Sequence, residues 1–409
     1  MKKKILTVGT LALMLSMNAQ TNPVSDSTKV DSTSYKSRKI KLDEVMFASS
    51  YYSQNGNNSA VTGGIGTEQL TDIATTINLN FSKLNKKSNK HYYNVELGLD
   101  TYTSASSDKI DPNTVSSASV DDNRYYGSFN YKFQNNVNGY TLGGGLSVSK
   151  EFDYRSMGGN LLFSKLSEDK SREISVKASA FLDTWRVIYP IEFRPSGYGD
   201  GSHKDTLPVV SKPRNSYNLG LILSQVVNRD FQFAILGDIS YQEGLLGTTF
   251  QRVYFNDGTG TSEKLPSTRL KLPLGIRGSY FLGDRIVLRG FYRYYWDNWD
   301  MNSHTASLEL SYKITPFVSI SPSYRFYIQS GVKYFAKYQE HSLSNEFYTS
   351  DYDLSKFTSN MFGLNARFSN MNGKSFMKRL NTVEIRYAFY QRSTGLNSHI
   401  VSLVLTFKK

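Results

Sequence analysis

The chain has 409 residues, and its 48 lysines and arginines outnumber its 35 aspartates and glutamates, which gives a formal net charge of +13 at pH 7. The absence of cysteine excludes disulfides, thiolate metal sites and cysteine nucleophiles. The basic residues are scattered singly, which argues against a nucleic-acid-binding surface. Tyrosine and phenylalanine number 29 and 24, yet no apolar run reaches the ~18 residues of a transmembrane helix, so a helical membrane protein is excluded.

The first residues are typical of a secretory signal peptide, which we place at residues 1–20. Three lysines at positions 2–4 precede an apolar run that extends to Leu15. This run is too short to span a bilayer, which needs about 20 residues. Residues 21–38 are polar, rich in serine and threonine and without periodicity, so we expect a disordered periplasmic tail. The folded part is predicted to comprise residues 39–409.

From about residue 41 onward, segments of strand length alternate apolar and polar side chains. In residues 303–314, apolar and aromatic side chains take the even positions, and serine, threonine, Glu309 and Lys313 take the odd ones. A helix would instead repeat its apolar residues at every third and fourth position. Sixteen such segments predict an all-β, antiparallel up-and-down transmembrane barrel, with fourteen strands as the alternative count.

The connectors between these segments alternate in length. The long connectors are residues 55–73, 104–121, 189–212, 244–266 and 331–355, and all of them fall at odd-numbered gaps. The even-numbered gaps are short, and so are three odd-numbered hairpins near residues 151–153, 298–301 and 392–395. An outer-membrane barrel has this layout, with short periplasmic turns and long extracellular loops. We therefore expect the cell outer membrane as the location, with both termini periplasmic.

The polar face of the strands is expected to line the lumen, because an arginine that faces lipid at the bilayer midplane costs about 2–4 kcal/mol. The basic residues that fall on polar-face positions are Arg269, Lys271, Arg277, Arg285, Arg289, Arg293 and Arg325. They could form an anion-attracting pore wall or a clamp for an acidic ligand. Alternatively, they could join Glu309, Glu384 and Asp297 in a cross-strand network that fills the lumen.

The hairpin at residues 293–310 is the most distinctive stretch. A turn at Asp300 would set Trp296 opposite His304, and both would then lie on the outer face at the membrane interface. Aromatic residues at segment ends are typical of membrane girdles, and Tyr294 and Phe407 are assigned to the girdle as well.

Four further residues are predicted at the extracellular mouth, namely Asp297, Trp299, Asp351 and Asp353, where they could contact a ligand or partner. The two carboxylates in the SDYDLSK loop could bind a divalent cation, but they lack the full spacing of a calcium loop, so a capping role is expected and no metal is assigned. No histidine lies beside a serine with a third orienting group. The chain is therefore not expected to be an enzyme, and neither catalytic residues nor a cofactor are assigned.

Several stretches resemble a family of outer-membrane proteins from Bacteroidota that carries a domain-of-unknown-function label. They are residues 115–133, 216–231, 265–282, 293–310, 321–335 and 350–356, and the resemblance covers roughly residues 40–409. Genes of that family often stand near genes for thioredoxin-like proteins, a small lipoprotein and a flavin transferase. The resemblance thus implies the fold, the location and an association with thioredoxin-like or flavinylated envelope partners, but it offers no catalytic residues.

Two functions remain open at this point. The first is a channel or transporter for small anionic or redox-active solutes. The second is a non-conducting subunit of a larger outer-membrane complex, which would bind other outer-membrane proteins or lipoproteins. The bulky residues Phe291, Tyr295, Phe317 and Tyr327, which we expect in the lumen, favour a filled barrel and hence the second function. In both cases outer-membrane lipids surround the chain, and nucleic acid is not a partner.

Overall fold

The computed structural model describes residues 38–103, 121–193, 210–369 and 379–408. Within them, sixteen antiparallel strands form one closed barrel, and two short strands form a separate hairpin. The predicted count of sixteen strands is therefore confirmed, and the alternative of fourteen is wrong. The signal peptide and nearly all of the tail lie outside the described residues, as does most of the connector at 104–121.

The barrel strands are β1 (Lys41–Asn55), β2 (Leu70–Leu84), β3 (Lys90–Thr103), β4 (Asp121–Asn135), β5 (Tyr140–Lys150), β6 (Tyr154–Leu166), β7 (Arg172–Arg186), β8 (Ser211–Val226), β9 (Phe231–Gly244), β12 (Thr268–Leu282), β13 (Ile286–Asp297), β14 (Asn302–Lys313), β15 (Val318–Gln329), β16 (Phe357–Ser369), β17 (Leu380–Arg392) and β18 (Asn397–Lys408). The separate hairpin is β10 (Arg252–Tyr254) and β11 (Gly260–Ser262). The described residues also include three single turns of 3-10 helix, η1 (Ala60–Thr62), η3 (Ile191–Phe193) and η4 (Tyr352–Leu354).

Each barrel strand pairs with its neighbours in chain order, and the sheet closes between its first and last strands. The closing pair runs without a shift in register from Glu44 opposite Lys408 to Asn55 opposite Asn397. β12 follows β9 directly around the barrel, because β10 and β11 belong to the connection between them. Closure leaves no unpaired strand edge, which is what a sheet needs if it is to be surrounded by lipid.

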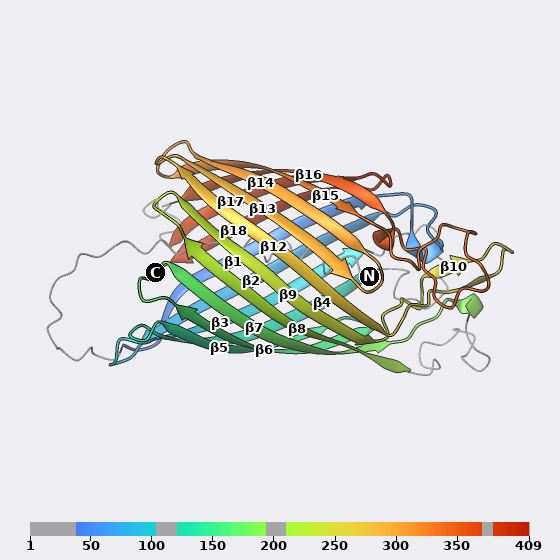
Figure 1. Ribbon diagram of the computed structural model, residues 1–409, viewed down its shortest axis with the longest axis horizontal. Coiled ribbons are helices and arrows are strands. Elements are labelled where there is room, and N and C mark those ends of the chain that lie inside the picture. Colours follow the sequence, from blue (N-terminus) through green and yellow to red (C-terminus); the bar gives the residue numbers. More distant parts are fainter. Residues whose placement is uncertain (1–37, 104–120, 194–209, 370–378, 409) are drawn as a thin grey trace.

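The connections differ between the two ends of the barrel, as the sequence predicts (Figure 1). Tight turns join β2 to β3, β4 to β5 and β12 to β13 at one end, where Gly139 and Gly283 adopt the positive φ of 61° that such turns favour. Long connections gather at the other end, on the right of Figure 1. We call these the turn end and the loop end. Both described chain ends lie at the turn end, because the number of strands is even.

The two faces of the barrel wall differ in polarity. Outward positions carry exposed apolar side chains on strand after strand, such as Leu97, Leu161, Leu274 and Leu308, which are 56%, 71%, 58% and 51% exposed. Inward positions carry mostly polar side chains, so the alternation with a period of two separates an apolar exterior from a polar lumen. Among the described residues, no helix is long and apolar enough to cross a membrane.

Candidate functional site: a capped and basic lumen

Most of the buried apolar residues lie at the loop end rather than in the barrel wall. We define the cap as residues 56–69, 245–267 and 330–356 together with the β13–β14 turn at 298–301. One cluster joins Val61 of the β1–β2 loop to Phe250 of the β9–β12 loop, with Trp185 of β7 beside them. A second cluster joins Leu246, Trp299, Met301 and Val332. The long loops thus fold into one packed layer with its own apolar core.

The cap crosses the mouth of the barrel. The β1–β2 and β9–β12 connections are separated by eight strands in either direction around the sheet, so they are rooted on opposite sides of an opening about 30 Å wide. Their tips nevertheless meet, because the Arg252 guanidinium donates a hydrogen bond of 2.8 Å to the Val61 carbonyl oxygen. Two loops rooted half a circumference apart can touch only if they span the mouth.

The β15–β16 loop adds a third arm to the cap. Its Thr349 hydroxyl donates to a Glu263 carboxylate oxygen at 2.6 Å, and the backbones of Lys264 and Tyr348 exchange two hydrogen bonds. His341 is 1% exposed, with its Nε2 3.1 Å from the Thr349 carbonyl oxygen. Burial lowers the pKa of His341, although the charge of nearby Glu340 acts in the opposite direction.

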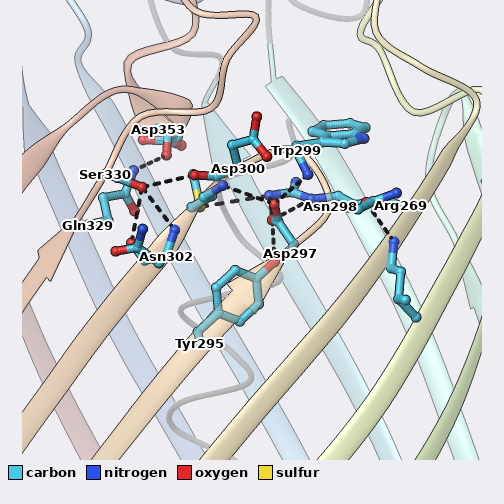
Figure 2. A network of polar contacts seen from close by, with 12 residues as sticks. Arg269, Tyr295, Asp297, Asn298, Trp299, Asp300, Asn302, Gln329, Ser330 and Asp353 are labelled. Carbon is cyan, nitrogen blue, oxygen red and sulfur yellow. Dashed lines mark hydrogen bonds and ion pairs between the residues drawn. The ribbon is translucent and has the colours of Figure 1, made fainter.

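Asp297 is the centre of the polar network that holds the β13–β14 turn (Figure 2). Its carboxylate is fully buried and pairs with the Arg269 guanidinium, whose Nε lies at 2.9 Å. The Tyr295 hydroxyl and the Trp299 backbone N–H donate to the same carboxylate at 2.7 and 2.9 Å. The Arg269 guanidinium also stacks on the Trp299 ring, 4.3 Å from its centroid. Asp297 and Trp299, which the sequence places at the mouth as candidates for partner contact, are thus engaged within the cap, where Trp299 is only 2% exposed.

The register of the β13–β14 hairpin differs from the expected one by two residues. Trp296 pairs with Asn302, and His304 pairs with Tyr294, because the turn at 298–301 is centred on Trp299 rather than on Asp300, which adopts a φ of +66°. His304 still faces outward, where its Nδ1 lies 2.7 Å from the Tyr292 hydroxyl and its ring packs on Tyr294. These aromatic groups lie at the loop end of the outer face.

Phe407 lies at the opposite end of the outer face. It pairs with Val45 and with Leu380, close to the end of the last strand. The aromatic residues assigned to the girdle are therefore divided between the loop end and the turn end of the barrel.

The two aspartates of the SDYDLSK loop are engaged within the protein. Asp351 caps η4 by accepting a hydrogen bond of 2.9 Å from the Asp353 backbone N–H. Asp353 forms an ion pair of 2.8 Å with Arg392, which extends inward from β17. Their polar atoms thus fix the β15–β16 loop to the barrel wall.

Six of the seven predicted lumen cations lie at inward positions of β12, β13 and β15, namely Arg269, Lys271, Arg277, Arg289, Arg293 and Arg325. Arg285 does not, because it lies in the exposed turn between β12 and β13. Phe317, expected in the lumen, is likewise 52% exposed in the β14–β15 turn. In both cases the strand that follows begins later than the alternation suggests, at Ile286 and at Val318.

The inward cations differ in whether they have a partner. Arg269 pairs with Asp297, and Arg289 pairs with Glu309 at 2.5 Å. Within the described residues, the remaining four form neither an ion pair nor a side-chain hydrogen bond: Lys271, Arg277, Arg293 and Arg325. A partly buried cation without a partner is costly unless water or an anion compensates it. The cross-strand network predicted as an alternative is therefore only partial.

The opposite wall of the lumen is acidic. Glu96 and Asp100 face inward from β3, which is eight strands away from β13 around the barrel. Arg124 on β4 lies 3.7 Å from Asp100 and 3.6 Å from Glu151, so this side carries its own ion pairs. This wall is not uniformly acidic, because Arg124 and Lys177 also face the lumen from it, just as Asp297 and Glu309 face the lumen from the basic side.

An acidic cluster near the loop end was not anticipated from the sequence. Asp122 is the second residue of β4, while Glu151 and Asp153 lie in the β5–β6 turn, and carboxylate oxygens of all three lie within 4.8 Å of one another. Burial raises the pKa of Glu151, and the Tyr102 hydroxyl donates to it at 2.9 Å. The only sequence signal was the pair of acids in a tight hairpin, because contact with Asp122 depends on the register between strands.

The family model of DUF3570, described as a protein of unknown function, matches residues 109–401. The chain belongs to this family. This agrees with the resemblance to a family of unknown function, whereas the Bacteroidota source and the gene neighbourhood stay expectations. No curated protein matches the DUF3570 chain.

Several solved structures are similar in fold to the DUF3570 barrel at low identity. A bacterial polysaccharide outer membrane secretin has a TM-score of 0.45 and 9% identity, covering 90% of this chain and 98% of that one. OccD3 (OpdP) of Pseudomonas aeruginosa has a TM-score of 0.43 and 10% identity, covering 90% and 91%. A BenF-like porin from Pseudomonas fluorescens Pf-5 has a TM-score of 0.42 and 9% identity, covering 90% and 99%.

Proposed function

We propose that this DUF3570 chain is an outer-membrane β-barrel that passes small solutes and prefers anions. A closed sheet with an apolar exterior and a polar interior suits a lipid bilayer, because lipid can satisfy no backbone hydrogen bond. The turn end would face the periplasm and the cap the outside, consistent with the signal peptide expected at residues 1–20. The observation that carries the preference for anions is the set of unpartnered inward cations Lys271, Arg277, Arg293 and Arg325.

The cap limits how solutes would enter. Because its loops span the mouth, a solute must pass beside the packed clusters rather than through a wide opening. We therefore propose a small single-channel conductance in the closed state, which increases when the loops separate. No enzymatic step forms part of this proposal.

Planar bilayers under a salt gradient test the proposal. Wild-type protein should give stepwise currents whose reversal potential indicates anion selectivity, and Arg293→Glu should shift that potential toward cation selectivity. Lys165→Glu is the matched control, because Lys165 is exposed on the outward face of β6 and donates to the Asn138 carbonyl oxygen at the turn end. An inserted, folded barrel that stays silent even after the β9–β12 loop is shortened would refute the channel.

The structure also favours a second candidate, a non-conducting subunit of an outer-membrane complex. The specific observation is the cap itself, since a packed layer of loops across the mouth obstructs the barrel and presents a folded surface to a partner. Absence of current, together with defined proteins or lipoproteins that co-purify in fixed ratio and are lost when the cap is deleted, would support this function. A link to thioredoxin-like or flavinylated partners rests on the family resemblance alone.

A further inference from the structure

Arg293 and Arg325 flank a strip of small residues on the lumen wall below the cap. They lie on β13 and β15, on either side of β14, about 10 Å apart across the sheet. Arg293 is opposite Thr305, and Arg325 is opposite Ser307, so the inward side chains between them are short hydroxyls. The offset along the strands is two residues, about 7 Å. Two long arginine side chains can therefore converge above β14, where nothing bulky separates them.

Neither arginine is neutralised by the protein. Within the described residues, both lack an ion pair and a side-chain hydrogen bond, and the buried Nε of Arg293 has no acceptor. The two guanidiniums are instead close enough to repel each other. The charge of Arg293 reaches the carboxylate of Asp238 on β9, but no ion pair joins these two residues. Arg269, Arg289, Arg386 and Arg392, by contrast, each pair with a carboxylate.

Apolar and aromatic side chains border the pair. Gly275 of β12 is opposite Arg293 and carries no side chain of its own, and the side chains of Phe291 and Leu236 lie over it. Tyr327 of β15 stands beside the pair, with its ring 5.6 Å from that of Phe357 and its hydroxyl donating to Gln329 at 2.6 Å. Since that hydroxyl proton is already used, the donors that remain around the recess include the two guanidiniums and the hydroxyls of Thr305 and Ser307 between them.

We infer that Arg293 and Arg325 form a recess that binds the oxyanion group, a carboxylate or a phosphate, of a small solute. Guanidinium groups offer planar pairs of N–H donors that match the oxygens of both groups, and an anion between two such groups removes their mutual repulsion. This inference rests on the proposed function in that the ligand is a solute in the lumen, but binding itself does not require conduction.

Equilibrium dialysis of the full chain in detergent at low ionic strength, with radiolabelled inorganic phosphate as the probe, tests the recess. Wild-type protein should bind phosphate saturably. Loss of charged hydrogen bonds in Arg293→Gln or Arg325→Gln should weaken binding at least about tenfold. Arg325→Lys should bind less well than wild type, because it keeps the charge but loses the fork of donors.

Lys177→Gln is the matched control, because Lys177 lies at an inward and exposed position of β7, away from the recess. It should change phosphate affinity by less than about twofold. Circular dichroism and heat-dependent mobility on gels establish that each variant is folded. Competition by acetate supports a site for either oxyanion, and saturable binding without such competition supports a site for phosphate alone.

Two outcomes overturn the proposed recess. The first is no saturable binding of phosphate to folded wild-type protein. The second is a loss of phosphate affinity in Lys177→Gln equal to that in the arginine variants, which would indicate diffuse attraction to a basic lumen. The channel proposal fails separately. Saturable binding in a barrel that never conducts would support the binding recess and refute the channel. Anion-selective current without saturable binding would support the channel and refute the recess.

Discussion

Replacement of Asp297 by asparagine tests whether the polar network fastens the cap to the barrel. The substitution keeps the size of the side chain but removes the charge that faces Arg269, which is 12% exposed. In the wild-type protein the hydroxyl of Tyr295 and the backbone N–H of Trp299 donate to this carboxylate. The substitution places an amide donor beside these two donors. Breaking a buried ion pair by removing one partner costs about 3–5 kcal/mol. Because asparagine retains one acceptor oxygen, we expect about 3 kcal/mol.

Urea unfolding of the barrel in detergent micelles measures this loss, with tryptophan fluorescence as the signal, because Trp299 is buried in the folded cap. Asp300→Asn is the matched control in the same turn. Asp300 is 64% exposed and lies 3.4 Å from Lys333, and such a surface pair contributes less than about 1 kcal/mol.

The combination with Arg269→Gln adds a second test. If Arg269 and Asp297 compensate each other, the double variant should lose less stability than the two single variants together, because no unpaired buried charge remains. A loss from Asp297→Asn no larger than that from Asp300→Asn, or strict additivity in the double variant, would refute the role of this network.

Four further outcomes follow from the same structure. Arg252→Ala should raise single-channel conductance in planar bilayers, since it removes the hydrogen bond that ties the loops across the mouth. Burial lowers the pKa of His341 in the folded cap. The stability that the neutral histidine contributes to the cap is therefore fully present above its ordinary pKa of about 6.5, and it is lost as the pH falls toward the lower pKa of the folded state. Conductance should rise on acidification, and His341→Gln should abolish that rise. Trp185→Ala should cost about 3–5 kcal/mol in urea unfolding, because the ring is 3% exposed. Leu161→Arg should cost about 2–4 kcal/mol in a lipid bilayer, whereas Asn160→Arg, which faces the lumen, should cost less than half as much.

The barrel itself could be predicted from the sequence, because its determinants are local. A period of two assigns side chains such as Leu308 and Glu309 to opposite faces, and the connector lengths distinguish the loop end from the turn end. The first property can be read within a window of about a dozen residues, and the second from the spacing between successive strands. The inward direction of Arg289, Arg293 and Arg325 follows from the same rule.

The partners of those side chains could not be predicted, because they depend on registers between strands. A turn centred one residue earlier than expected moved Trp296 from His304 to Asn302, although its face was unchanged. Because the register is uncertain, the sequence does not reveal that Arg289 pairs with a carboxylate while Arg293 forms no ion pair. Periodicity identifies a face, but the register identifies a neighbour.

The cap was also beyond prediction from local pattern. Val61 and Arg252 are 191 residues apart in the chain, and their loops have no common periodicity. Asp297 and Trp299 looked available at the mouth, because nothing near them in the sequence indicates the loops that cover them. Contacts of this kind arise only once the closed sheet has fixed the positions of the loop ends.

The cap also extends over the seam where the first and last strands meet. The Asn58 amide, in the β1–β2 loop, donates a hydrogen bond of 2.7 Å to the Thr394 carbonyl oxygen in the β17–β18 hairpin. This hydrogen bond therefore links the loop after β1 to the hairpin before β18, the two strands whose pairing closes the barrel. Separation of β1 from β18 at the loop end requires this hydrogen bond to break first, and the bond cannot form until the barrel has closed. A fully packed cap therefore indicates that the barrel has closed.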